Sequence, residues 1–93
     1  MSRRKLDVAR DAAKALADLP AKHFKQVVVK TLALIAEPFP HDSRPLQGHE
    51  GLFRIDSGEC GIVYSVDDEL VRIFVIGKRN NDDEVYRLLD RKT

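Results

Sequence analysis

The hydrophobic periodicity of the chain changes once, and this change limits the folds that are open to it. Between residues 9 and 36, apolar residues recur at the three- and four-residue spacing of helices. Between residues 52 and 76, the period becomes two, as in strands that bury one face. Helices followed by consecutive strands indicate a helical layer packed on a sheet, which is an α+β fold.

The first half of the sequence predicts one strand and two helices. Polar and apolar residues alternate over residues 4–8, which suits a short strand. Helical segments follow over 9–19 and 21–36, and because Pro20 separates them we expect a helical hairpin. Residues 37–45 hold three prolines and predict a loop. The second helix presents one apolar face: Phe24, Val27, Val28, Thr31, Leu32 and Ile35.

The second half predicts a three-stranded antiparallel meander and a C-terminal helix. The strands span 52–56, 60–66 and 70–76, and Gly77 ends the last one. Two short turns separate them, at residues 57–58 and 67–68. The predicted order is therefore a short N-terminal strand, a helical hairpin, the meander and a final helix.

Composition places the chain among small globular proteins. It has 93 residues, 43% of them apolar, and a net charge of +1, which fits a single domain over 1–93 and excludes a disordered polyelectrolyte. The near-neutral charge also argues against non-specific DNA binding. Cys60 is the only cysteine, and no apolar leader or membrane-length apolar run is present. We expect a cytoplasmic protein without disulfides and without membrane association.

Residue types that often carry metal or nucleophilic chemistry are sparse. His23, His41 and His49 have no partner at metal-ligand spacing, so we predict neither a metal nor another cofactor. Cys60 shares a predicted strand face with Tyr64, and we expect it in the core rather than as a nucleophile.

A cationic cluster is the one candidate site that the predicted fold assembles. Arg54 lies on a strand, and strand parity places it on the sheet face opposite that of Phe53 and Ile55. Lys78 and Arg79 follow the last strand, and Tyr86 lies on the C-terminal helix. Converging on one face, they can hold a phosphodiester backbone and stack a base. The residues alone favour a simpler alternative, which is surface arginines paired with nearby acids: Asp56, Asp82 or Asp83.

Three stretches, 12–20, 46–64 and 75–87, resemble the RelE/ParE superfamily of bacterial toxins. The third, with Gly-Lys-Arg before Glu-Val-Tyr, is the most specific and leans toward the RelE branch. The resemblance spans about residues 4–89 and implies a RelE-like toxin of a type II toxin–antitoxin system. Such a toxin is a metal-independent mRNA interferase, an endoribonuclease that inhibits translation by cutting ribosome-bound mRNA. Its implied partners are a cognate antitoxin, the ribosome and mRNA, with operator DNA reached only through the antitoxin.

The resemblance also assigns roles to particular residues. Arg79 matches the arginine that stabilises the transition state, and Tyr86 matches the tyrosine that orients the nucleotide. Arg54 occupies the position of a basic residue that holds RNA, and we count it as both catalytic and substrate-binding. Lys78, beside Arg79, is a second expected substrate-binding residue.

Two positions depart from the RelE pattern. Asp56 stands where RelE has a lysine, and Cys60-Gly61 stands where the family usually reads Tyr-Arg. Losing one transition-state donor typically lowers a rate by ~10²–10³. With Gly61 at this position, three alternatives remain open: a weak toxin, a degenerate toxin and a detoxified variant.

Two other functions remain open at this point. A catalytically inactive homologue can still bind an antitoxin and act as corepressor of the operon that they share. A toxin of the ParE type inhibits DNA gyrase through binding, which does not require a nuclease cluster.

Overall fold

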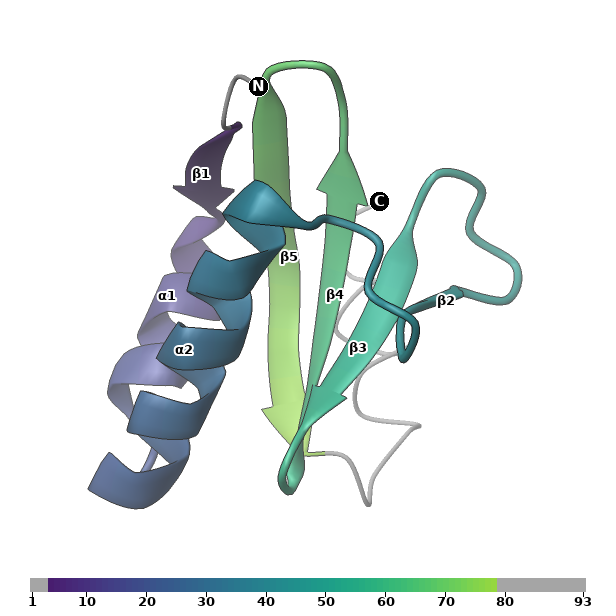
Figure 1. The fold of residues 1–93 in the computed structure, drawn as a ribbon. Coiled ribbons are helices and arrows are strands. Elements are labelled where there is room, and N and C mark those ends of the chain that lie inside the picture. The colour runs from purple at the N-terminus through teal and green to yellow at the C-terminus, as the bar shows by residue number, and fades with distance from the viewer. Residues whose placement is uncertain (1–3, 79–93) are drawn as a thin grey trace.

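The computed structural model describes residues 4–78, which form a five-stranded mixed sheet and two helices. Along the chain the elements are β1 (Lys5–Val8), α1 (Arg10–Ala17), α2 (Ala21–Ala36), β2 (Arg44–Pro45), β3 (Phe53–Ser57), β4 (Cys60–Val66) and β5 (Leu70–Lys78). The strand order is β1-β5-β4-β3-β2, with β1 parallel to β5 and the other neighbours antiparallel. Both helices lie against one face of the sheet (Figure 1). The α+β class, the helical hairpin and the meander are confirmed.

The turns of the meander follow from local backbone chemistry. Ser57 pairs with Cys60, so the two turn residues are Gly58 and Glu59 rather than the predicted 57–58. Gly58 has φ +58°, which suits the first central position of a type II′ turn. In the next turn, Asp67 Oδ1 accepts backbone N–H bonds from Glu69 at 2.8 Å and from the following residue at 2.7 Å.

Two boundaries differ from the sequence prediction. Part of the predicted 37–45 loop forms the short strand β2, which pairs with β3 at the sheet edge. Gly77 does not end the last strand, because it pairs with Gly61 inside the β4–β5 ladder. The periodicity of side chains gives no signal at a glycine, so the continuation to Lys78 was missed. The predicted C-terminal helix lies outside the described residues.

The core lies between the sheet and the two helices. Ile55, Ile62, Tyr64 and Ile73 are fully buried on the helix side of the sheet. The helices contribute Ala12, Val27 and Leu34 to the same cluster, and Leu6 and Val8 of β1 pack against it from the sheet edge. Cys60 belongs to this cluster and is 3% exposed, so its predicted place in the core is confirmed.

The apolar face of α2 is only partly used by this core. Val27, Thr31 and Leu34 are buried, whereas Phe24 and Leu32 are 42% and 51% exposed. The prediction placed Phe24 and Leu32 on the packed face and omitted Leu34. Both helices flank the same sheet face (Figure 1), so α2 buries a narrow stripe and keeps apolar surface outside. Neither helix in residues 4–78 is long and apolar enough to cross a membrane.

An aromatic anchor fixes the segment between α2 and β2. The ring of Phe53 lies 5.0 Å from that of Phe39, edge on, and 6.0 Å from that of Tyr64. The Tyr64 hydroxyl donates a hydrogen bond of 2.8 Å to the Pro38 carbonyl. Glu37 is extended, as expected before a proline, and this ends α2. These contacts hold the loop against β3 and β4.

The opposite side of the sheet carries no described helix, and we call it the helix-free face. The pairing of β3, β4 and β5 places on it Arg54, Asp56, Gly61, Val63, Val75 and Gly77. A second, smaller apolar cluster covers part of this face and contains Leu46, Val63 and Val75. The two described candidate residues lie on different sides of the sheet: Arg54 on the helix-free face and Lys78, the partner of Cys60, on the side of the helices.

Candidate functional site

Arg54 lies in the middle of β3 on the helix-free face, as its strand parity predicts. Its side chain is only 5% exposed. A guanidinium with so little contact to water needs compensating partners, because an uncompensated buried charge is strongly destabilising. The Arg54 Nε donates to Asp56 Oδ1 at 3.3 Å, two residues further along the same strand face.

Asp56 lies between two arginines. Its second oxygen, Oδ2, is 3.5 Å from Arg44 Nη2, and the Arg44 side chain is 55% exposed. Arg44 and Arg54 are direct partners across β2 and β3. Like charges in directly opposite positions are destabilising, and a carboxylate between them relieves this repulsion. The alternative of arginines paired with nearby acids is thus realised for Arg54, at a buried rather than a surface position.

Gly61 lies directly opposite Asp56 across β3 and β4. A Cβ placed on Gly61 would meet the Arg54 guanidinium, at 3.2 Å from Nη2, 3.5 Å from Nε and 3.6 Å from Cζ. The absent side chain at residue 61 therefore makes room for the cation on the neighbouring strand.

Lys78 lies on the other side of the sheet. It pairs with Cys60 across β4 and β5, and the two residues share the face toward the helices. The expected convergence of Lys78 with Arg54 on one face is therefore wrong. The reason is strand parity at the end of β5, which the sequence prediction ended at Ile76. Arg79 and Tyr86 lie outside the described residues, so their roles stay predictions.

The surroundings of Lys78 contain a cysteine and a histidine. A hollow of about 360 Å³ is lined by Leu19, Pro20, His23, Glu59, Cys60 and Lys78. Burial raises the pKa of the Cys60 thiol, and the Glu59 carboxylate raises it further. A protonated thiol is a weak nucleophile, so Cys60 acts here as a core residue and not as a reactive group. Among residues 4–78, no three His, Cys, Asp or Glu side chains gather to hold a metal ion.

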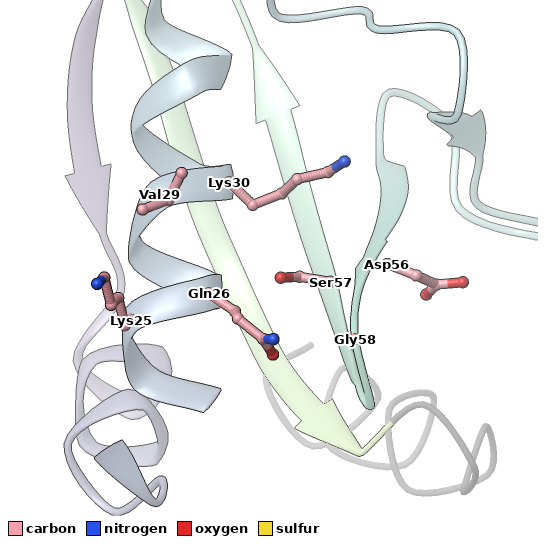
Figure 2. Close-up of a pocket in the computed structure, with 7 residues that line it drawn as sticks. All are labelled: Lys25, Gln26, Val29, Lys30, Asp56, Ser57 and Gly58. Carbon is pink, nitrogen blue, oxygen red and sulfur yellow. The ribbon is translucent and has the colours of Figure 1, made fainter. Parts of the chain in front are cut away.

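A groove of about 430 Å³ separates α2 from the β3–β4 hairpin. Figure 2 shows Gln26 and Lys30 reaching from α2 toward the strand residues that line its other side. Its lining residues are Lys25, Gln26, Val29, Lys30, Asp56, Ser57 and Gly58. Lys30 also bonds Asp42 at 2.8 Å, which lowers the pKa of that carboxyl group. The groove thus has a basic wall on α2, and the Asp56 side chain at its other side points away from the helix (Figure 2).

Sequence reasoning missed part of this arrangement. The pattern Arg54-x-Asp56 was a usable signal, because residues two apart on a strand share a face. Arg44 gave no comparable signal, since its place beside Arg54 depends on β2, a two-residue strand inside a proline-rich segment. The contact between Arg54 and Gly61 depends on the register of two strands.

Solved structures define the class of protein to which this fold belongs. A chain of the archaeal RelE–RelB complex from Pyrococcus horikoshii OT3 is 26% identical, with a TM-score of 0.73 over 84% of this chain and 97% of that one. A chain of the RelBE2 toxin–antitoxin complex from Mycobacterium tuberculosis is 25% identical, with a TM-score of 0.72 over 84% and 100%. A mutant of the E. coli toxin RelE in the free state reaches a TM-score of 0.79 over 98% of both chains and, at 22% identity, shares the fold. The architecture is that of the small RelE-like toxins.

The family follows from a match of the sequence itself. The family model described as the ParE toxin of type II toxin–antitoxin systems, parDE, matches residues 6–83. This chain therefore belongs to the ParE toxin family and is a toxin of a type II toxin–antitoxin system, within the predicted RelE/ParE superfamily. No curated protein matches the sequence. The family model carries the ParE name and the solved structures the RelE name, so the leaning toward the RelE branch stays a prediction.

Proposed function

We propose that this toxin is a ribosome-dependent mRNA endoribonuclease. The observation that carries the proposal is the arginine pair on the helix-free face, where buried Arg54 and exposed Arg44 both approach one carboxylate of Asp56. Two guanidinium groups that are held near one carboxylate supply the positive charge that a phosphodiester also attracts. The RelE-like fold and the Gly-Lys-Arg…Glu-Val-Tyr motif support the same activity.

The proposed reaction is an internal transfer at one phosphate of the mRNA. The 2′-oxygen attacks phosphorus and loses its proton, the bond to the 5′-oxygen breaks, and that oxygen takes up a proton. The products are a 2′,3′-cyclic phosphate and a 5′-hydroxyl end. Arg79 would stabilise the charge on the phosphorane, Tyr86 would orient the nucleotide, and Arg54 would hold the RNA backbone. Lys78, on the opposite face, would contact RNA only beyond the strand end.

The test is cleavage of mRNA on programmed ribosomes by the purified toxin without antitoxin. We expect cutting in the A-site codon, and a fall of roughly 10²–10³ in rate for Arg79→Ala. Tyr86→Ala and Arg54→Ala should also cleave more slowly. Arg72→Ala is the matched control, because Arg72 is an exposed arginine on β5 that pairs with Asp7 at 2.7 Å, at the β1 edge of the sheet. Equal cleavage by all variants would refute the assignment of these residues.

Inhibition of DNA gyrase is the second candidate function, because the family model that matches the sequence is that of ParE. The assay is supercoiling of relaxed plasmid by purified gyrase with increasing amounts of toxin. Inhibition of supercoiling, together with intact mRNA on programmed ribosomes, would replace the endoribonuclease proposal with this one.

A cognate antitoxin is the proposed protein partner, and it would bind on α2. Phe24, Val29 and Leu32 are 42%, 61% and 51% exposed on this helix. The helix has three lysines and no acidic residue, so an acidic amphipathic segment fits it. We expect Leu32→Glu to weaken binding of the antitoxin encoded beside the toxin gene, with little effect on folding. Lys14→Glu on α1 is the control. Through this partner, even a catalytically weak toxin would act as corepressor at operator DNA.

A further inference from the structure

The guanidinium of Arg54 fills the space above residue 61. Three of its atoms lie between 3.2 and 3.6 Å from the point where a Cβ of residue 61 would sit. All three belong to the guanidinium group, so this group is what a side chain at residue 61 would meet first. The nearest is tighter than an ordinary van der Waals contact, so a Cβ at residue 61 requires the Arg54 guanidinium to move by a few tenths of an ångström, and a longer side chain would compete with it for the same space.

Glycine is otherwise an unfavourable residue for this position. Gly61 is in the interior of β4, where glycine weakens a strand and often marks the close approach of another group. Gly77 lies directly opposite on β5, so neither strand places a Cβ on this part of the helix-free face. Here the approaching group is the cation of the adjacent strand.

Asp56 restrains the same guanidinium from the side. It follows Arg54 by two residues on one strand face and accepts a hydrogen bond from Nε at 3.3 Å. The Asp56 side chain is 23% exposed and that of Arg54 is 5% exposed, so solvent screens this ion pair less than a surface pair. The guanidinium is thus held below by the backbone of β4 and at its edge by a carboxylate.

We propose that Gly61 and Asp56 are positioning residues, which act on RNA cleavage through Arg54. The inference rests on the proposed function, in which Arg54 holds the RNA backbone. By resemblance alone, Gly61 marks the loss of a catalytic arginine, whereas the structure gives the glycine a role of its own. In this chain, Gly61 allows the cation of β3 to occupy that part of the face, and Asp56 keeps it there.

A double-mutant cycle between residues 61 and 54 tests the geometric part. In the intact protein, we expect Gly61→Ala to lower the thermal unfolding midpoint, because the new Cβ forces the buried Arg54 guanidinium to shift by a few tenths of an ångström from its place beside Asp56. In an Arg54→Ala background, the same substitution should raise the midpoint, because the Cβ enters vacated space and alanine loses less backbone entropy than glycine. An equal effect in both backgrounds would overturn the proposal.

A spectroscopic signature covers the case in which Arg54→Ala folds poorly. The Arg54 Nε–H should give a resolved, slowly exchanging resonance in the wild-type ¹⁵N spectrum. We expect this resonance to shift and exchange faster in Gly61→Ala and in Asp56→Asn, and to stay unchanged in the Arg72→Ala control. An unchanged Arg54 resonance in both variants would also overturn the proposal.

The functional part is measured by cleavage on programmed ribosomes. A displacement of about 1 Å can lower a rate by about 10²-fold. Because the shift of Arg54 is a few tenths of an ångström, we expect a smaller but measurable loss for Gly61→Ala in the intact toxin. The same substitution should cause no further loss when Arg54 is already alanine. A further loss in that background means that Gly61 does not act through Arg54. A wild-type toxin that leaves mRNA intact, with the stability cycle and the resonance as expected, supports the positioning of Arg54 and refutes the endoribonuclease proposal.

Discussion

Replacing Tyr64 with phenylalanine should measure how firmly the loop after α2 is attached to the sheet. Tyr64 is fully buried, and its hydroxyl makes a 2.8 Å hydrogen bond to the Pro38 carbonyl. Phenylalanine keeps the ring and its contact with Phe53, whose centroid lies 6.0 Å away. The substitution therefore removes one hydrogen bond and leaves its acceptor without the donor.

The expected loss follows from the surroundings of the acceptor. A buried acceptor left without its donor costs ~1–3 kcal/mol, whereas the net worth of a typical hydrogen bond is ~0.5–1.5 kcal/mol. Pro38 is half-buried, so water can reach its carbonyl after the substitution. We therefore expect a loss of about 1 kcal/mol in the free energy of unfolding. For a chain of this size, that corresponds to roughly 4–8 °C in Tm.

Urea unfolding followed by circular dichroism is the assay. The midpoint should fall while the dependence on urea stays constant, since the fold and its buried surface are unchanged. Ser65→Ala is the matched control, because Ser65 is adjacent on β4, faces the other side of the sheet, and makes no hydrogen bond to a side chain within residues 4–78. It should stay within about 0.5 kcal/mol of the wild type. A Tyr64→Phe protein as stable as the wild type would refute the idea that this bond fastens the loop.

Three further predictions concern single positions. Gly61→Arg should reduce both stability and cleavage rather than restore a toxin, because its Cβ meets the Arg54 guanidinium at 3.2 Å; higher activity would contradict this. Gly58→Ala should lose ~1–2 kcal/mol, chiefly from its φ of +58°, and urea unfolding should show a smaller loss for Gly58→Asn. Burial raises the pKa of the Cys60 thiol, so the folded state keeps its proton to higher pH than the unfolded state. Stability should be fully present below about pH 8.5 and fall as the pH rises further, and a Cys60→Ala variant should show a smaller fall between about pH 8 and 10.

The elements that could be predicted from the sequence are those whose pattern is local. The period change near Gly51 predicts two helices and a meander, and Pro20 and the turn residues separate them. The elements that were missed depend on partners distant in sequence. β2 exists because β3 pairs with it, and Leu34 is buried because α2 packs on the sheet with the stripe that holds Val27, Thr31 and Leu34.

The same distinction explains the candidate site. Strand parity correctly placed Arg54 on the face away from the helices, since parity needs only the strand itself. The face of Lys78 was predicted wrongly, because it depends on how far β5 continues beyond Ile76. Gly77 has no side chain and gives no periodicity signal, so the predicted strand ended too early, at Ile76.

Register gives the glycine at residue 61 a physical meaning that a sequence comparison cannot supply. Position by position, Gly61 is an arginine lost from the RelE pattern, and it suggests a disarmed toxin. In the folded sheet, residue 61 lies opposite Asp56 and beneath Arg54, so a long side chain at 61 and the observed guanidinium compete for one volume. Compared with the RelE pattern, this part of the face lacks the cations at residues 56 and 61 and keeps the one at residue 54. Under the proposed function, RNA cleavage therefore depends on where the Arg54 guanidinium is held, and the identity of residue 61 alone does not determine it.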